Sequence, residues 1–145
     1  MNIVKLEEKY LDDLAEIDAV SHAPWTKESF KSELENGVAR YYVMEHNERA
    51  VGYIGYWWSF YEVQITFLAV HPSFRGKGIA KQLISHISNE CKEMGVETIQ
   101  LEVRQSNIPA ISLYEKCGFY KVGTRPKYYG GKEDAILMDL PLRKD

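Results

Sequence analysis

Hydrophobic residues in the first third of the chain change their spacing, and each spacing predicts a different element. A short alternating run at 3–6 predicts a first strand. The helix after it is predicted from apolar residues at three- and four-residue steps, namely Tyr10, Leu11, Leu14, Ile17 and Val20. Residues 23–25 break this pattern, and Thr26 is a favourable N-cap for a second helix, which Asn36-Gly37 ends.

Three strands and a long helix are predicted in the middle of the chain. The β-rich runs at 40–45 and 50–59 are joined by a polar turn and predict a hairpin, and 63–70 predicts a further strand. From Gly78 the pattern becomes helical, and Gly95 is suited to end this helix. The apolar face of the helix consists of Ile79, Leu83, Ile87, Cys91 and Met94.

The last third of the chain predicts three more strands and one more helix. Clean alternation marks 98–104 as a strand, and Asn107 begins a helix. Further strands are predicted from Gly118 to about Gly123 and over 133–140. The order β-α-α-β-β-β-α-β-α-β-β predicts a mixed sheet with helices on its faces, in the α/β or α+β class. Short connections favour one domain over residues 1–145.

The composition narrows the classes of function. The chain is 45% hydrophobic and 27% charged, and its net charge of −3 comes from mixed signs, so a general nucleic-acid-binding face is not expected. No stretch reaches the roughly 18 apolar residues that span a bilayer, and 1–5 do not resemble a secretory signal. We therefore expect a cytoplasmic protein without membrane contact. Cys91 and Cys117 lack metal-ligand spacing, so we expect reduced thiols and no metal.

A glycine-rich turn joins the strand that ends at Val70 to the long helix. Glycines let the backbone approach a ligand closely, and the free N–H groups of a helix start attract anions. Three cationic side chains lie in the turn and at the start of the helix that follows it, namely Arg75, Lys77 and Lys81. Neither the P-loop spacing nor a complete dinucleotide-binding pattern is present. Taken by itself, this segment has two interpretations. It is either an anion-binding site or an ordinary glycine-bearing turn with surface charges.

Several motifs together resemble one family. Arg75-x-x-Gly78-x-Ala80 matches the R/Q-x-x-G-x-G/A signature of the GCN5-related N-acetyltransferase (GNAT) superfamily. Other stretches resemble its ribosomal-protein-alanine N-acetyltransferase branch: Pro24-Trp25-Thr26, Leu101-Glu102-Val103-Arg104, Ser106-Asn107, Leu113-Tyr114, Gly118-Phe119, Arg125, Tyr128-Tyr129 and Glu133-Asp134-Ala135. The resemblance covers nearly the whole chain. It implies the GNAT fold, a mixed and mostly antiparallel sheet of about seven strands with helices on both faces.

The resemblance also implies a site for acetyl-CoA where the fourth and fifth strands part. The cofactor-binding residues carried over by position are Leu68, Val70, Arg75, Gly76, Lys77, Gly78, Ile79, Ala80, Lys81 and Asn107. In this family the amide of the residue at Val70 polarises the thioester carbonyl, and the turn binds the pyrophosphate. These roles are expectations for the present chain.

Two side chains are candidates for proton transfer during direct attack of an amine on the thioester. The resemblance assigns Glu102 as the base, and the alternative is a solvated or salt-bridged strand carboxylate. It places Tyr114 near the sulfur as the acid, and the alternative is a core aromatic residue. A phenol of pKa about 10 can protonate a thiolate whose conjugate acid lies near 8.5. No covalent nucleophile is required, and nothing beside Cys117 suggests activation.

The resemblance specifies the acceptor site less well than the cofactor site. Trp25, Phe67, Tyr128 and Tyr129 are candidate walls of the acceptor groove, with packing roles as the alternative. Related chains often carry Asn where Phe67 stands, so this position departs from the pattern. Glu62 is a further candidate contact for a cationic substrate, or else a solvated strand end.

The branch implies a protein N-terminus as acceptor, in particular the N-terminal alanine of a ribosomal protein. A small amine such as a polyamine, a lysine ε-amine, and a non-catalytic acetyl-CoA-binding module are the alternatives. The retention of both Glu102 and Tyr114 argues against the module.

Overall fold

The computed structural model describes residues 1–19 and 25–142, so Val20 and Pro24, which the sequence patterns include, lie outside the described residues. The strands are β1 Asn2–Lys5, β2 Ala39–His46, β3 Arg49–Ser59, β4 Glu62–Val70, β5 Thr98–Arg104, β6 Tyr120–Tyr129 and β7 Glu133–Pro141. The α-helices are α1 Leu11–Asp18, α2 Lys27–Leu34, α3 Ile79–Glu93 and α4 Ile108–Lys116. Short 3₁₀ turns at Glu8–Tyr10 and Pro72–Phe74 precede α1 and α3.

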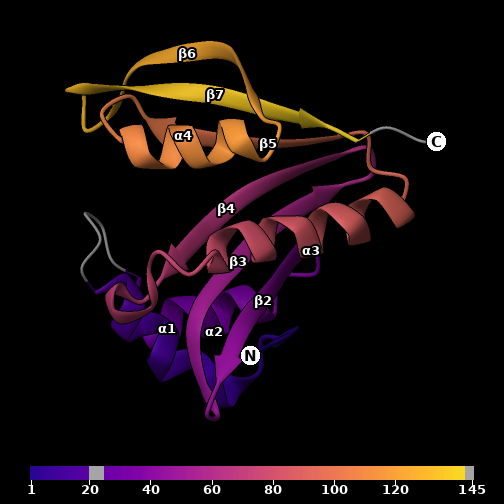
Figure 1. Ribbon diagram of the computed structural model, residues 1–145, viewed down its shortest axis with the longest axis vertical. Coiled ribbons are helices and arrows are strands. Elements are labelled where there is room, and N and C mark those ends of the chain that lie inside the picture. The colour runs from indigo at the N-terminus through magenta and orange to yellow at the C-terminus, as the bar shows by residue number, and fades with distance from the viewer. Residues whose placement is uncertain (20–24, 143–145) are drawn as a thin grey trace.

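All seven strands form one sheet in the order β1-β2-β3-β4-β5-β7-β6. Every neighbouring pair is antiparallel except β4 and β5. That parallel pairing covers only Glu62–Gln64 against Thr98–Gln100, after which the two strands separate. In Figure 1, β5, β6, β7 and α4 therefore lie together on one side of a gap, and β2–β4 with α1–α3 lie on the other. The prediction of a mixed, mostly antiparallel seven-stranded sheet is confirmed.

Helices cover both faces of this sheet. The apolar face of α3 packs on one face of β2–β5, where Leu83, Ile87 and Cys91 are fully buried, and α4 packs against the same core. Helices α1 and α2 cover the opposite face through a second core that includes Leu14, Phe30 and their strand partners. The two cores share the sheet as their wall, which fixes α3 and α1 on opposite sides of it.

The predicted helix ends are confirmed by their hydrogen bonds. The Thr26 side chain accepts a hydrogen bond from the Ser29 amide at 3.2 Å, and the Asn107 side chain accepts one from the Ala110 amide at 3.2 Å. Such caps satisfy amides that have no partner within the helix. Gly95 follows α3 with φ +83°, a conformation that glycine adopts without strain.

The prediction for β6 is wrong in length, because the strand continues beyond Gly123 to Tyr129. It is an edge strand whose side chains are mostly exposed, so it lacks the alternation that marks a half-buried strand. Its pairing with β7 is also irregular between Arg125 and Tyr129, where Lys127 has φ +53°. Pro126 lies in this stretch, and an edge strand tolerates proline because its outer amides need no partner.

No helix in the described ranges is both long and apolar enough to cross a membrane.

Gly55 provides a test of the packing between β3 and the α1–α2 core. A Cβ atom at this position would lie only 2.4–2.8 Å from ring atoms of Tyr41, whose side chain is itself buried. We expect Gly55→Ala to lower the free energy of unfolding by about 1–3 kcal/mol, measured by urea denaturation. Gly37→Ala is the control, because nothing lies within 4 Å of its Cβ position. Equal stability of the two variants would contradict this packing.

Candidate active site

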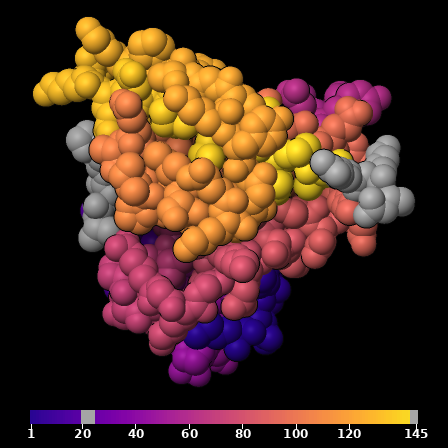
Figure 2. Space-filling view, turned by 45° about the horizontal axis from the view of Figure 1, so that its top comes forward, coloured from indigo at the N-terminus to yellow at the C-terminus, as the bar shows by residue number. Residues whose placement is uncertain are grey.

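The separation of β4 and β5 opens a cleft of about 380 Å³ in the middle of the sheet. Its lining residues come from both strands and from three neighbouring elements: Asp18, Ile65, Thr66, Phe67, Leu68, Leu101, Glu102, Val103, Arg104, Asn107, Tyr114 and Tyr129. Six of the residues predicted from the sequence are thus brought together, namely Phe67, Leu68, Glu102, Asn107, Tyr114 and Tyr129. Figure 2 shows the two halves of the molecule meeting, with the orange β6 and α4 region against the pink start of α3.

The edge of β4 that faces this cleft carries backbone amides without strand partners. The His71 amide donates to the Val51 carbonyl of β3 at 2.8 Å. Because successive amides of a strand point to opposite sides, the Val70 and Leu68 amides point away from β3, toward β5. Beyond Gln64 no residue of β5 pairs with this edge. Two amides are therefore available to a ligand that lies along β4.

The glycine-rich turn lies at the end of that same edge. Gly76 and Gly78 both have φ +78°, a left-handed conformation that favours glycine, and Gly78 is the N-cap of α3. As the N-cap, Gly78 has no side chain that could cap this helix start, which leaves the first amides available to an anion. The Arg75 Nε donates to the Val70 carbonyl at 3.2 Å, which ties the turn to β4. The Lys77 ammonium lies 5.0 Å from the centre of the Phe74 ring.

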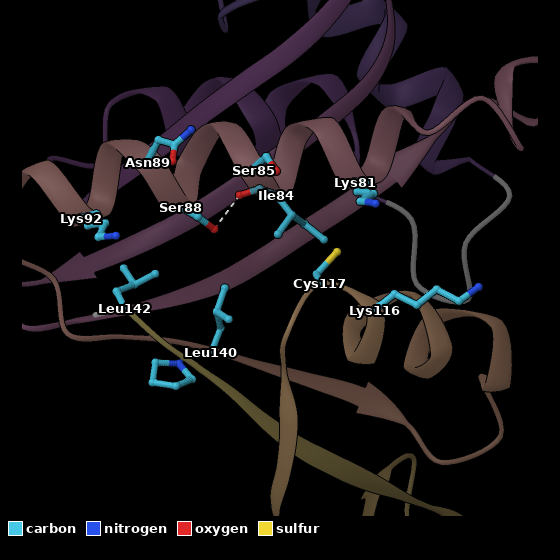
Figure 3. Close-up of a pocket in the computed structure, with 11 residues that line it drawn as sticks. Lys81, Ile84, Ser85, Ser88, Asn89, Lys92, Lys116, Cys117, Leu140 and Leu142 are labelled. Carbon is cyan, nitrogen blue, oxygen red and sulfur yellow. Dashed lines mark hydrogen bonds between the residues drawn. The ribbon is translucent and has the colours of Figure 1, made fainter. Parts of the chain in front are cut away.

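Ile79, Ala80 and Lys81 form the first turn of α3, and their side chains have different surroundings. Ile79 is buried in the core, so only its backbone can meet a ligand. Ala80 is half-buried, whereas Lys81 is exposed. Lys81 lines a second pocket of about 430 Å³ between α3 and the α4–β7 region, together with Lys92 and Lys116 (Figure 3). Three lysines around one pocket make it suitable for an anionic group.

Neither cysteine shows the properties of a nucleophile. Burial raises the pKa of Cys91 to about 12. Cys117 lines the pocket between α3 and α4, and burial raises its pKa as well, although Lys81 acts in the opposite direction. Both thiols are therefore protonated at neutral pH. Within the described ranges, no three His, Cys, Asp or Glu side chains come together as a metal site.

Glu102 lies on β5 at the mouth of the cleft. Its side chain is 14% exposed and pairs with the Arg125 guanidinium of β6, with 3.2 Å between Oε1 and Nε. Burial raises the pKa of the neighbouring Tyr129, and the charge of Glu102 raises it further. The Arg104 guanidinium lies 4.2 Å from the centre of the Tyr129 ring and also pairs with Glu133. The carboxylate thus stands in a network of fixed charges rather than in bulk solvent.

Tyr114 reaches the cleft from α4. Its ring packs against Phe119, with 5.8 Å between the ring centres. Burial raises the pKa of its phenol to about 12, with smaller contributions from Tyr129 and Cys117. The hydroxyl therefore stays protonated across the physiological range and can donate a proton. Asn107 lies at the start of the same helix, where its side-chain oxygen caps the helix.

The four candidate acceptor residues do not share one environment. Phe67 lines the cleft, and Trp25 packs behind it with 4.5 Å between ring centres. Trp25 itself is not among the residues that line the cleft. Tyr129 lines the cleft, whereas Tyr128 is 51% exposed and lies outside it, against Arg125. The structure thus favours Phe67 and Tyr129 as direct cleft walls.

Asp18 is a buried acidic residue of the cleft that the sequence did not predict as part of the site. It is the last residue of α1 and only 6% exposed, and it accepts hydrogen bonds from the Trp25 amide at 2.5 Å and the Tyr53 hydroxyl at 3.1 Å. The sequence pattern of α1 contains a signal that marks Asp18 as unusual. Leu11, Leu14 and Asp18 follow the i, i+3, i+7 spacing of one helix face, so an acid stands within an apolar stripe.

A sheet opened by two parting strands, with free strand amides leading to an anion-binding helix start, defines an acetyl-CoA-dependent N-acetyltransferase. The family comparison agrees, since the acetyltransferase (GNAT) family matches residues 7–119. The chain therefore belongs to the GNAT acetyltransferase family, and acetyl-CoA is its co-substrate.

Similar proteins cover almost the full length of the chain. An Escherichia coli K12 protein named [Ribosomal protein bS18]-alanine N-acetyltransferase is 34% identical over an alignment of 146 positions, gaps included, that covers 97% of each chain. A Bacillus subtilis protein, for which the same activity is a provisional name, is 41% identical over 137 residues, 92% of this chain and 91% of its own.

Solved structures show the same architecture. The crystal structure of the ribosomal-protein-S18-alanine N-acetyltransferase from Escherichia coli has a TM-score of 0.89 and 32% identity, covering 99% of this chain and 95% of its own. An aminoglycoside 6′-N-acetyltransferase complexed with coenzyme A has a TM-score of 0.86 over 100% and 99% of the two chains. At 18% identity, it is similar in fold alone.

The raised pKa of Tyr114 predicts a pH dependence of stability. The phenol ionises near 10 in the unfolded chain but near 12 in the folded protein. Its contribution to stability is therefore complete below pH 10 and is lost as the pH rises toward 12. We expect the wild-type free energy of unfolding to fall more steeply over this range than that of Tyr114→Phe, measured by urea denaturation at each pH. Parallel curves would show that the phenol is not buried as described.

Proposed function

We propose that this enzyme acetylates the N-terminal α-amine of a protein, with the N-terminal alanine of ribosomal protein bS18 as the first candidate. The observation that carries this proposal is the match to enzymes named for that activity over nearly the full length of both chains. The structure supports it with a cleft that contains an acid and a base candidate. Its location is proposed to be the cytoplasm, where ribosomal proteins are made.

The cofactor has a continuous set of partners in this proposal. The Leu68 and Val70 amides bind the arm that carries the acetyl group, and the Val70 amide also polarises the thioester carbonyl. The backbone from Gly76 to Lys81 binds the pyrophosphate, helped by the charges of Arg75, Lys77 and Lys81. The pocket that Lys81 lines beside α3 takes the nucleotide end. Asn107 contacts the arm from the other side of the cleft.

The chain's own groups then move two protons. Glu102 takes a proton from the acceptor amine, directly or through a water molecule, and the free amine attacks the thioester carbon. As the C–S bond breaks, Tyr114 gives its proton to the departing sulfur, while the nitrogen releases its second proton to solvent and the phenolate is reprotonated from solvent. Phe67 and Tyr129 form walls on the acceptor side, and Trp25 supports Phe67 from behind.

A weak base is sufficient to remove the proton from an α-amine. Its pKa of roughly 7.7–8.0 means that removing its proton near pH 7 costs only about 1 kcal/mol, whereas a lysine amine of pKa about 10.4 costs about 4.6 kcal/mol. Glu102 is held in position at the cleft by its ion pair with Arg125. A base of this kind is adequate for a protein N-terminus and poorly suited to lysine.

The acceptor class can be tested with a peptide panel. Peptides that differ only in their first residue, with spermidine and free lysine, are incubated with acetyl-CoA while CoA release is followed. We expect the highest kcat/KM for Ala-starting peptides, because the named relatives act on an N-terminal alanine. Turnover of spermidine or lysine alone would contradict a protein acceptor, and cofactor binding without any turnover would contradict an enzyme.

The proton-transfer roles can be tested by two conservative substitutions. We expect Glu102→Gln and Tyr114→Phe each to lower kcat by about 10²-fold or more, because each removes one proton-transfer group. The Kd for acetyl-CoA, measured by calorimetry, is expected to stay within about twofold. Tyr128→Phe is the matched control, since this hydroxyl lies outside the cleft. Near-wild-type turnover in both cleft variants would refute the assignment.

A further inference from the structure

The cleft contains two carboxylates, and only one of them has a cationic partner among the residues that the structure describes. Glu102 pairs with Arg125 at 3.2 Å. Among the described residues, Asp18 accepts two hydrogen bonds, both from neutral donors, the Trp25 amide and the Tyr53 hydroxyl. Within residues 1–19 and 25–142, no Lys, Arg or His forms an ion pair with Asp18. The charge of this cleft residue is left uncompensated by the described part of the chain.

Burial makes this lack of a cation costly. Asp18 is 6% exposed, and a buried carboxylate that has only neutral donors loses much of its hydration without an opposite charge in return. Asp13, buried to the same degree on the same helix, shows the usual solution, since Arg49 binds it at 2.6 Å. Asp18 differs from Asp13 in that it lines a cleft that a substrate can enter.

A second polar group of the cleft also lacks a good partner. The hydroxyl oxygen of Thr66 is buried and makes no hydrogen bond of normal geometry, although Tyr41 lies near it. Thr66 occupies the irregular position of β4, where the pairing with β3 shifts between Gly55 and Tyr56, and it lines the same cleft as Asp18. An oxygen acceptor and an anion in one cleft together suit a group that is cationic and donates several hydrogen bonds.

We propose that Asp18, with the Thr66 hydroxyl in the same cleft, binds the ammonium form of the acceptor amine before its proton is removed. At pH 7 an α-amine of pKa roughly 7.7–8.0 is mostly charged, so the enzyme meets its acceptor as a cation. Asp18 supplies the missing opposite charge, and the Trp25 amide and Tyr53 hydroxyl fix the carboxylate in position. Glu102 then receives the proton. Asp18 is thus a substrate-binding residue, and this inference rests on the proposed amine-acetylating function.

The test compares two Ala-starting peptides that differ only in charge. One has the free N-terminal amine, and the other is its des-amino analogue, with a propanoyl group in place of the alanyl residue. In the wild type, the charged peptide is expected to bind about tenfold more tightly or better, by calorimetry with CoA present. In Asp18→Asn this preference is expected to disappear, while the Kd of the des-amino analogue and of acetyl-CoA stay within about twofold.

Glu33→Gln is the matched control, because Glu33 is also a buried carboxylate with neutral donors, Tyr41 and Trp57, but does not line the cleft. It is expected to keep the preference for the charged peptide. Equal weakening of both peptides in Asp18→Asn would overturn the inference, because it would indicate a structural role only. No preference for charge in the wild type would overturn it without any variant, even if Asp18→Asn does not fold.

A failure of the Asp18 inference can be distinguished from a failure of the proposed function. If the wild type turns over spermidine but no peptide, the protein acceptor is wrong. The Asp18 inference is then tested on spermidine, for which Asp18→Asn is expected to raise KM by about tenfold and Glu33→Gln to leave it unchanged. An unchanged KM in Asp18→Asn would overturn it.

Discussion

The architecture of this enzyme depends on how briefly β4 and β5 pair. Only three residue pairs join β4 to β5 in the sheet, and beyond Gln64 and Gln100 the strands part. Unpaired strand amides in a protein interior are normally costly. Here the unpaired amides of Leu68 and Val70 form part of the site, because they face a space that a ligand with its own hydrogen-bonding groups can fill. The glycine-rich turn continues the same edge to the start of α3.

Much of the fold could be predicted from the sequence because most elements have one buried face. The stripe from Ile79 to Cys91 and the alternation over 98–104 both reflect burial against the core, and both predictions are confirmed. The length of β6 could not be predicted, since an edge strand with exposed side chains has no such pattern. Local caps such as Thr26 and Asn107 were predictable because their chemistry is confined to a single turn.

The site was predictable only in part, for a related physical reason. Glu102, Asn107 and Tyr114 lie in motifs of a known family, and the structure places them in one cleft. Asp18 reaches the cleft because α1 packs against β3 and β4, and a contact of this kind depends on packing between distant segments. The exposure of Tyr128 likewise follows from the irregular pairing of β6 with β7, which local sequence does not specify.

The cleft is lined from both faces of the sheet, by Asp18 and Phe67 on the α1–α2 side and by Tyr114 on the α4 side. Side chains from both layers of the protein therefore meet in one space where β4 and β5 part. In the proposed reaction an acyl donor along β4 and an amine near Asp18 occupy this space at the same time. Direct transfer between them requires no covalent storage of the acyl group on the protein.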